Sequence, residues 1–303
     1  MADLTIRLKT LTPLWTGGVD QQCDRLHETG LIGSIRWWYE ALIRGLDGSA
    51  CDPTSQDRCP DDSGKRCVAC QLFGCTGWSR RFRLRVLDRD GQPIQDPLEK
   101  DLDFVLQFVE LHPISDKETW LMWLMAKAVE IAARYGALGG KTTLKPQRNA
   151  RGLEDTLKKL PRTKPGDDMG VLAWQMGPSL VASRLKIVES VKSYARTYSI
   201  SELPDLRWFF FVSGSFLKRD QMNRLMGLSP DGRTIIRRGA VENALRGEIG
   251  KSKKLFSFSV GGGRVWGYAS NRELRDKIIG EIGKELGKSD FTIRTGEEVL
   301  DEL

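Results

Sequence analysis

Cysteines are the residues of this chain whose types and spacing most directly suggest chemistry. Five of the six fall between residues 51 and 75, and four of them follow the order Cys51-x7-Cys59-x7-Cys67-x2-Cys70. A two-residue gap, as in Cys67-Val-Ala-Cys70, lets two thiolates reach one metal ion. The intervening residues are polar or are proline and glycine, so the loop needs an internal cross-link to become ordered. We therefore expect a structural zinc ion held by Cys51, Cys59, Cys67 and Cys70.

Other uses of these thiols stay open from the sequence. Free thiols, redox chemistry and disulfides are the alternatives, although disulfides are rare in a cytosolic chain. Cys75 is a possible substitute ligand, and Cys23 lies far from the cluster and is expected to be a small buried residue. A catalytic zinc ion is not expected, because four thiolates leave no open position for water.

A second distinctive block runs from Glu28 to Gly45 and reads ETGLIGSIRWWYEALIRG. Apolar residues recur in it at helical spacing and predict one buried stripe, formed by Leu31, Ile35, Trp38 and Leu42. Arg36, Trp37 and Arg44 lie off that stripe, where an exposed indole beside two cations suits contact with nucleic acid. Two glycines near the helix start would admit another chain, and the free N–H groups there favour phosphate. The alternative is an ordinary amphipathic helix in which Trp37 is half-buried.

The distribution of charge is more informative than the formal net charge of +7. Residues 141–164 carry a net charge of +6 and residues 233–254 carry +5, whereas the chain from residue 271 onward carries −3. Cations concentrated in two segments are typical of a surface that binds a polyanion. A solvated charged face is the alternative for either segment alone.

Motifs for nucleotide chemistry are absent from the sequence. Gly139-Gly140-Lys141-Thr142 would need a glycine at position 135 to form a P-loop, and Tyr135 stands there. The glycine run that starts at Gly261 enters a strand pattern and lacks the dinucleotide-binding spacing. His27 could act as a general base but has no suitably spaced partner, and His112 is expected to be structural. We therefore do not expect an enzyme.

Length and composition indicate two globular domains of ordinary size. The 303 residues are 40% hydrophobic and 29% charged, as in folded and not in disordered chains. The most apolar run, Trp120–Ala133, is interrupted by Lys127 and Glu130 and is too short to span a bilayer. The N-terminus carries no secretory pattern. We expect a cytoplasmic protein that does not contact a membrane.

The elements that position these residues are predicted from periodicity and turn residues. The first half shows the order strand, helix, strand, strand, helix, which is that of a ferredoxin-like unit. The ranges are Thr5–Leu11, residues 30–46, Arg81–Asp88, Leu102–Glu110, and a helix that opens with a capping box at Ser115–Glu118 and ends at Tyr135. Strict alternation in the second strand puts Arg81, Arg83 and Arg85 on one face, so this strand would present cations from the sheet.

The second half is expected to hold a divergent unit of the same class. Its predicted strands are Arg207–Val212, Leu255–Val260, Arg264–Tyr268 and Phe291–Arg294. Its predicted helices are Leu180–Tyr198, Phe216–Met226, and one that opens with a capping box at Ser270–Glu273 and continues to Leu286. Residues 152–170 have the composition of a linker. The prediction is an α+β protein with two ferredoxin-like domains, residues 1–160 and 161–303, and a zinc-binding insertion at about residues 48–75 of the first.

Four segments carry a resemblance to a known family. They read TLTPLWTGG from Thr10, ETGLIGSIRWWYEALIRG from Glu28, CVACQLFGCTG from Cys67 and FSFSVGGGRVWGY from Phe256. In these segments the chain resembles the RAMP superfamily of CRISPR-associated proteins, and within it the first-subunit family of the type III-B, or Cmr, effector complex. The resemblance covers most of the N-terminal half and is looser in the C-terminal half.

This resemblance implies two packed ferredoxin-like domains and a non-catalytic subunit that binds RNA in a basic cleft. The implied partners are the 3′ part of the guide RNA, the target RNA or both, and the other subunits of the effector complex. A different subunit of such complexes cuts the target. The implied RNA-contacting residues are Arg36, Trp37, Trp38, Gly261, Gly262, Gly263, Arg264 and Trp266, and Lys141, Thr142 and Lys145 match a second glycine-rich loop in character. To these we add Arg44, Arg81 and Arg148 as further candidate RNA-contacting cations.

Two functions from other classes stay open. One is a metal-independent endoribonuclease that processes guide precursors with His27 as its base. The other is a scaffold that contacts only neighbouring subunits, because tryptophan-rich surfaces also form protein interfaces.

Overall fold

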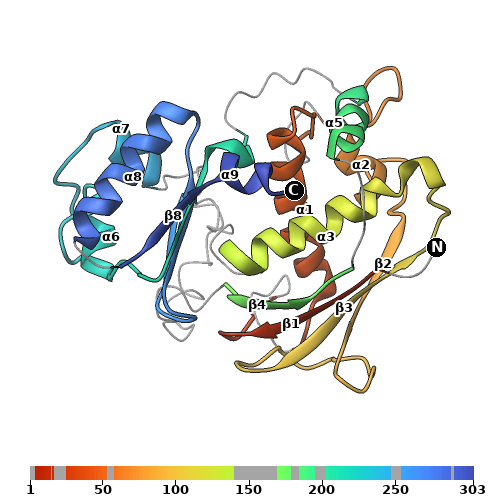
Figure 1. The fold of residues 1–303 in the computed structure, drawn as a ribbon, viewed down its shortest axis with the longest axis horizontal. Helices are drawn as coiled ribbons and strands as arrows, with labels where there is room; N and C mark the ends of the chain where they lie inside the picture. The colour runs from red at the N-terminus through yellow and green to blue at the C-terminus, as the bar shows by residue number, and fades with distance from the viewer. Residues whose placement is uncertain are drawn as a thin grey trace, which may run out of the picture.

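The computed structural model describes residues 4–14, 16, 25–52, 58–139, 169–178, 184–194, 203–246, 254–287 and 290–303. These residues form two four-stranded antiparallel sheets that lie next to each other, each with helices packed on it (Figure 1). The architecture agrees with the predicted α+β class. Within the described ranges, each helix is too short or too polar to cross a membrane.

The first sheet contains β1 (Leu4–Thr10), β2 (Phe82–Leu87), β3 (Asp103–Glu110) and β4 (Leu172–Met176) in the order β2-β3-β1-β4. Helices α1 (Glu28–Gly45) and α3 (Trp120–Tyr135) cover one face of this sheet (Figure 1). Strand alternation explains why a single face is covered. In β1, Leu4, Ile6 and Leu8 are buried beneath the helices, and the residues between them are exposed or half-buried.

The second sheet repeats the same arrangement. Its strands are β5 (Phe209–Ser213), β6 (Leu255–Phe258), β7 (Arg264–Tyr268) and β8 (Thr292–Thr295), in the order β6-β7-β5-β8. The helices on its outer face are α6 (Arg219–Leu225), α7 (Ala240–Leu245) and α8 (Arg272–Leu286). In both sheets the second, third, first and fourth strands follow one another. This order is compatible with two ferredoxin-like domains.

The second sheet is apolar on both faces. Phe210 and Val212 of β5 pack in one core with the residues of α8, whereas Phe209 and Phe211 pack in the other core with the first domain. A strand buried on both faces appears in the sequence as a continuous apolar run, which is the pattern of RWFFFV from Arg207. The two domains therefore share a core, and their mutual placement depends on the inner face of this sheet.

Several smaller elements complete the described fold. They are α2 (Val68–Phe73), α5 (Arg184–Ser193), α9 (Gly296–Asp301) and the 3₁₀ helices η1 (Asp116–Glu118) and η2 (Leu206–Trp208). Helix α2 lies in the cysteine-bearing segment between α1 and β2.

Most predicted strands and long helices are confirmed, with ends shifted by a few residues. The predicted helix at Leu180–Tyr198 is confirmed over Arg184–Ser193 and excludes Tyr194, and the rest of its predicted range lies outside the described residues. Strand β4 is missing from the prediction. Since β4 pairs with β1, the first sheet extends past the predicted division at residue 160. The predicted linker at residues 152–170 lies outside the described residues except at its end.

Both predicted capping boxes are wrong. Ser115 starts the 3₁₀ helix η1 and its hydroxyl donates to the Glu118 carboxylate at 3.0 Å, so it caps no backbone N–H group. Helix α8 is capped by Asn271 instead of Ser270. The Asn271 side chain lies one residue closer to the first turn and accepts from the backbone N–H of Leu274 at 2.9 Å.

Candidate metal centre and nucleic-acid interface

The four predicted metal ligands come together in the structure. Cys51 follows α1, Cys59 lies in the loop that comes after, and Cys67 and Cys70 lie at the start of α2. Their Sγ atoms all lie within 4.8 Å of one another, and each residue is at most 3% exposed. The Sγ atom of Cys51 lies 3.6 Å from that of Cys70 and 3.8 Å from that of Cys67.

This group has the dimensions of a tetrahedral thiolate site. With Zn–S bonds of about 2.3 Å, neighbouring sulfurs of a tetrahedron lie about 3.8 Å apart. The spacing around Cys51 agrees with that value. The described cysteines form no disulfide bond, and Cys75 lies outside the group of four. The four residues can therefore hold a metal ion, and their donor set and spacing fit zinc.

Two of the thiols accept hydrogen bonds from groups around the cluster. The backbone N–H of Cys67 donates to the Sγ atom of Cys59 at 3.2 Å, and Arg36 donates to the Sγ atom of Cys70 at 3.3 Å. Hydrogen bonding with the Cys51 side chain lowers the pKa of Cys67 to about 7, whereas hydrogen bonds among the four thiols raise the pKa values of Cys51 and Cys70. The thiolate is the form that binds a metal ion, so a bound ion would have to displace the protons of Cys51 and Cys70.

The predicted RNA-contacting cations of α1 have partners within the chain. The Nε atom of Arg36 donates to Glu40 at 2.7 Å, and its Nη1 atom donates to the carbonyl oxygen of Gly74 at 3.1 Å. Arg44 donates to the carbonyl oxygen of Pro204 at 2.9 Å. Burial raises the pKa of Glu40, and the charges of Arg36 and Arg44 oppose that rise. These side chains connect α1 to the cysteine segment and to the start of the second domain.

The tryptophans of the opening helix form the contact between the domains. Trp38 is 2% exposed and Trp266 is 1% exposed, and their ring centroids lie 5.1 Å apart. Trp37 is half-buried and lies 5.7 Å from Phe209 and 6.2 Å from Trp266. The indole N–H of Trp38 donates to the carbonyl oxygen of Ala137 at 3.0 Å. The rings of Trp38 and Trp266 thus have no open face on which a base could stack in this conformation.

Two further predicted cations also hold the fold together. Arg264 donates from the second sheet to the carbonyl oxygens of Ala133 and Gly136 at the end of α3, at 3.0 and 2.8 Å. Burial lowers the pKa of Arg264 to about 10, and the negative end of the helix dipole favours the cation there. Arg81 is 7% exposed and pairs with Glu118 at 3.2 Å, so it leaves the open face of the sheet.

The glycine turn between β6 and β7 lies at the surface beside the first domain. Gly261, Gly262 and Gly263 have φ angles of +63°, +83° and +93°, which strongly favour glycine. A Cβ atom at Gly263 would lie 2.6 Å from the backbone of Ser215, whereas one at Gly262 would meet no atom within 4 Å. A Cβ atom at Gly261 would lie 3.0 Å from a methyl group of Leu11. The turn therefore reaches the end of β1 and leaves its middle residue open.

The remaining predicted residues, Lys141, Thr142, Lys145 and Arg148, lie outside the described residues. The nearest described position is Gly139, whose N–H donates to the hydroxyl of Ser34 on α1 at 2.9 Å. The segment that carries these cations thus leaves the described fold beside the N-terminal half of α1.

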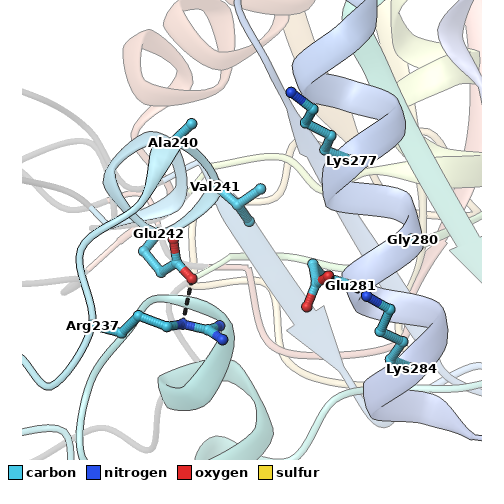
Figure 2. A pocket seen from close by; sticks show the side chains of 8 residues that line it. All are labelled: Arg237, Ala240, Val241, Glu242, Lys277, Gly280, Glu281 and Lys284. Carbon is cyan, nitrogen blue, oxygen red and sulfur yellow. Dashed lines mark hydrogen bonds and ion pairs between the residues drawn. The ribbon is translucent and has the colours of Figure 1, made fainter.

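A surface pocket of about 440 Å³ lies in the second domain between α7 and α8 (Figure 2). Its cations are paired with carboxylates. Arg237 lies 2.5 Å from Glu242, and Lys284 lies 2.6 Å from Glu281. This balance of charge gives no preference for an anionic ligand.

The chain is similar to a chain in a cryo-EM structure of the Type III-B Cmr-beta bound to cognate target RNA. The two are 10% identical with a TM-score of 0.46, over 94% of this chain and 99% of that one. It is also similar to a chain in the structure of Type III-B Cmr-beta bound to cognate target RNA and AMPPnP in the presence of ssDNA. Here the identity is 12% and the TM-score 0.45, over 93% of this chain and 98% of that one.

A search among curated proteins found no match. The sequence model of the RAMP superfamily, in contrast, matches residues 7–269. This span begins in β1, includes the cysteine group and the tryptophans of α1, and ends just after β7. Since the match covers most of the chain, including every strand except β8 at least in part, the chain belongs to the RAMP superfamily.

Proposed function

We propose that the chain is a non-catalytic RNA-binding subunit of a type III-B CRISPR effector complex. It would contact the 3′ part of the guide RNA, the target RNA or both, in a basic cleft between the glycine turn of the second domain and the start of α1. Membership of the RAMP superfamily supports this proposal, as does the resemblance carried by the block from Glu28 to Gly45. The observation that carries it is the position of the two ends of the basic segment.

These two ends are hydrogen-bonded to each other. The N–H of Leu138 donates to the carbonyl oxygen of Gly170 at 2.9 Å, and the N–H of Gly170 donates back at 2.8 Å. Between them lie residues 141–164, which carry a net charge of +6. The basic segment therefore leaves and re-enters the described fold at one place.

That place is next to the glycine turn. The hydroxyl of Thr12 donates to the carbonyl oxygen of Met169 at 3.1 Å, and the N–H of Leu11 donates to Val171 at 2.8 Å. Leu11 is also the residue that Gly261 approaches. Consecutive backbone N–H groups in a glycine turn can bind an anion, and the absence of side chains lets phosphate come close. We therefore assign the RNA contacts to Gly261, Gly262, Lys141, Thr142, Lys145 and Arg148.

The packed cations and indoles have a supporting role in this proposal. Trp38, Arg44, Arg264 and Trp266 hold the two domains together, and Arg36 connects α1 to the cysteine segment. The cleft then depends on their packing, and RNA does not need to touch them.

The test is RNA binding by the full chain with Lys141→Ala/Lys145→Ala. Each lost phosphate contact lowers the salt slope by about 0.7, which corresponds to roughly fivefold in affinity at 0.1 M salt. The double variant should bind labelled single-stranded RNA roughly 25-fold more weakly, whatever its sequence. Lys277→Ala/Lys284→Ala on α8 is the matched control and should bind as the wild type does. Equal affinity of the Lys141/Lys145 variant and the wild type at low salt would remove the support for this cleft.

The non-catalytic part of the proposal has its own test. Repeat-containing RNA is incubated with the wild type and with His27→Ala. We expect no cleavage by either protein. Cleavage by the wild type that is lost in the variant would favour the endoribonuclease alternative instead.

We also propose that Cys51, Cys59, Cys67 and Cys70 hold a structural zinc ion. Binding energy on the order of 10 kcal/mol would order the segment between α1 and β2. Cys70→Ser should reduce zinc in the purified protein from one equivalent to a small fraction and lower the melting temperature. Cys75→Ser is the matched control, because Cys75 lies outside the group, and it should keep one equivalent. Elemental analysis that finds less than half an equivalent in the wild type would contradict the zinc site.

A further inference from the structure

The first sheet carries cations on the face opposite α1 and α3. Burial of every second residue leaves Arg83 and Arg85 of β2 on this open face, and Arg7 and Lys9 of β1 lie there too. We call these four residues the sheet cations. In Figure 1 α1 and α3 lie on the other side of the sheet, and within the described ranges no helix packs on the open face.

The sheet cations form two pairs that run obliquely across the sheet. The members of each pair are two residues apart on one strand, which separates them by about 7 Å. Strands β2 and β1 flank β3, so the pairs lie about 10 Å apart across the sheet. The pairs are also offset along the strands, since Arg85 is in register with Gln107 of β3 and Arg7 with Val105. The result is a diagonal stripe of positive charge.

Little on this face neutralises the stripe. The three arginines form no ion pair with a carboxylate of the described residues, and Lys9 lies 3.9 Å from Asp101. Asp103 is the carboxylate on this face of the described strands; it lies opposite Lys9 in the register of β1 and β3 and is also engaged by Arg89 and Gln175, so the unneutralised charge is that of the three arginines. The stripe therefore has charge available for an external anion.

We propose that the sheet cations bind phosphate groups of single-stranded RNA, as a second surface in addition to the cleft. This inference rests on the proposed RNA-binding function. Three of the four cations are arginines, whose planar guanidinium groups bind phosphate in a bidentate manner. The open face of β1, β2 and β3 carries no aromatic side chain among the described residues, so bases have nothing to stack on. Binding by this surface is therefore independent of sequence and sensitive to salt.

An acidic protein is the competing occupant, and the face fits it less well. Protein interfaces have an apolar or aromatic centre that supplies most of the binding energy. Between the sheet cations the residues are Val105, Val109 and Gln107, all half-buried between longer polar side chains. Charge is the dominant feature of the face, and a polyanionic backbone matches it.

The test is the salt dependence of binding to a labelled 20-nucleotide oligouridine. Arg83→Gln/Arg85→Gln removes two phosphate contacts, so the slope of log K against log salt should fall by about 1.4. Affinity at 0.1 M salt should fall roughly 25-fold by the same relation. Lys277→Gln/Lys284→Gln, at the balanced pocket of Figure 2, makes the same change in net charge and should leave both quantities unchanged. The changed arginines are exposed, so the melting temperatures should match the wild type.

The outcomes separate this inference from the proposed function. If the Arg83/Arg85 variant binds like the wild type while Lys141→Ala/Lys145→Ala binds weakly, the sheet surface is refuted and the cleft stands. If the wild type does not bind oligouridine at all, both are refuted. If the Arg83/Arg85 variant keeps its RNA affinity but loses binding to polyglutamate, the face serves an acidic protein and the inference is wrong.

Discussion

The contact between Trp38 and Gly136 provides a sharp test of how α1 is held. A Cβ atom at position 136 would lie 2.2 Å from Cζ2 and 2.6 Å from Cη2 of Trp38. Gly136 has φ −111° and ψ −138°, and a double-mutant cycle isolates the part of the cost of Gly136→Ala that comes from the contact of its Cβ atom with Trp38. Trp38 cannot move aside easily, because its N–H is bonded to Ala137 and its ring packs on Trp266. Overpacking of this kind should cost about 1–3 kcal/mol in free energy of unfolding.

The reciprocal substitution should relieve that clash. Trp38→Phe alone leaves the carbonyl oxygen of Ala137 without its buried donor, at a cost of about 1–3 kcal/mol. It also opens a cavity, which adds on the order of 1 kcal/mol. Phenylalanine lacks the outer ring atoms that would meet a Cβ atom at position 136. The double variant should therefore be more stable than the sum of the two effects, by about 1–2 kcal/mol.

Equilibrium urea unfolding of the four proteins gives this coupling energy. Gly280→Ala is the matched control. Gly280 lies within α8, where a Cβ atom would meet nothing within 4 Å. This control should gain about 0.5–1 kcal/mol from helix propensity. If the effects of Gly136→Ala and Trp38→Phe add without coupling, the packing described for α1 is refuted.

Two other predictions concern the glycine turn and the contact between the domains. Gly262→Ala should lower the free energy of unfolding by about 1–2 kcal/mol, because its positive φ disfavours alanine. Gly263→Ala should cost about 1–3 kcal/mol more, because its Cβ atom would overlap the backbone of Ser215; equal melting temperatures of the two variants would contradict the turn geometry. Arg264→Met should lower the free energy of unfolding by about 1.5–3 kcal/mol for each charged hydrogen bond to α3 that is lost. The loss is partly offset because the variant no longer buries a charge. A melting temperature like that of the wild type would show that Arg264 does not hold the domains together.

Regular patterns in the sequence predicted the larger elements of the fold. The alternation of β2 and the apolar stripe of α1 are local, so each element could be recognised by itself. Strand β4 could not, because Leu172–Met176 is a short edge strand without strict alternation and depends on its pairing with β1. The initiation of α8 at Asn271 was misplaced because two adjacent polar residues compete for one cap.

In the candidate sites, too, features that depend on neighbouring residues were predicted from the sequence, and contacts between distant residues were not. The spacing of four cysteines predicted their convergence, because a metal site restricts ligand type and position together. The tryptophans were predicted to contact RNA, and the sequence around Trp38 does not reveal that Trp266 packs on it from another domain. Likewise, Arg264 and Arg44 donate hydrogen bonds to carbonyl oxygens that are distant in the sequence. A local sequence pattern does not predict such contacts.

The sheet cations were only partly recognised from the sequence. The alternation of β2 placed three arginines on one face, and two of them are exposed there. The side chain of Arg81 is buried instead, because Glu118 lies close enough to form an ion pair with it. Arg7 and Lys9 join the same face only through the register of β1 with β3, which the sequence does not fix.

Photo-crosslinking of the full chain to thiouridine-labelled RNA, followed by peptide mapping, tests the central proposal most directly. We expect crosslinked peptides from residues 139–170 and from the strand–turn–strand unit of residues 255–268, because the basic segment leaves and re-enters the fold beside that turn. Crosslinks confined to α8 and α9, with none in those two regions, would contradict the proposed cleft.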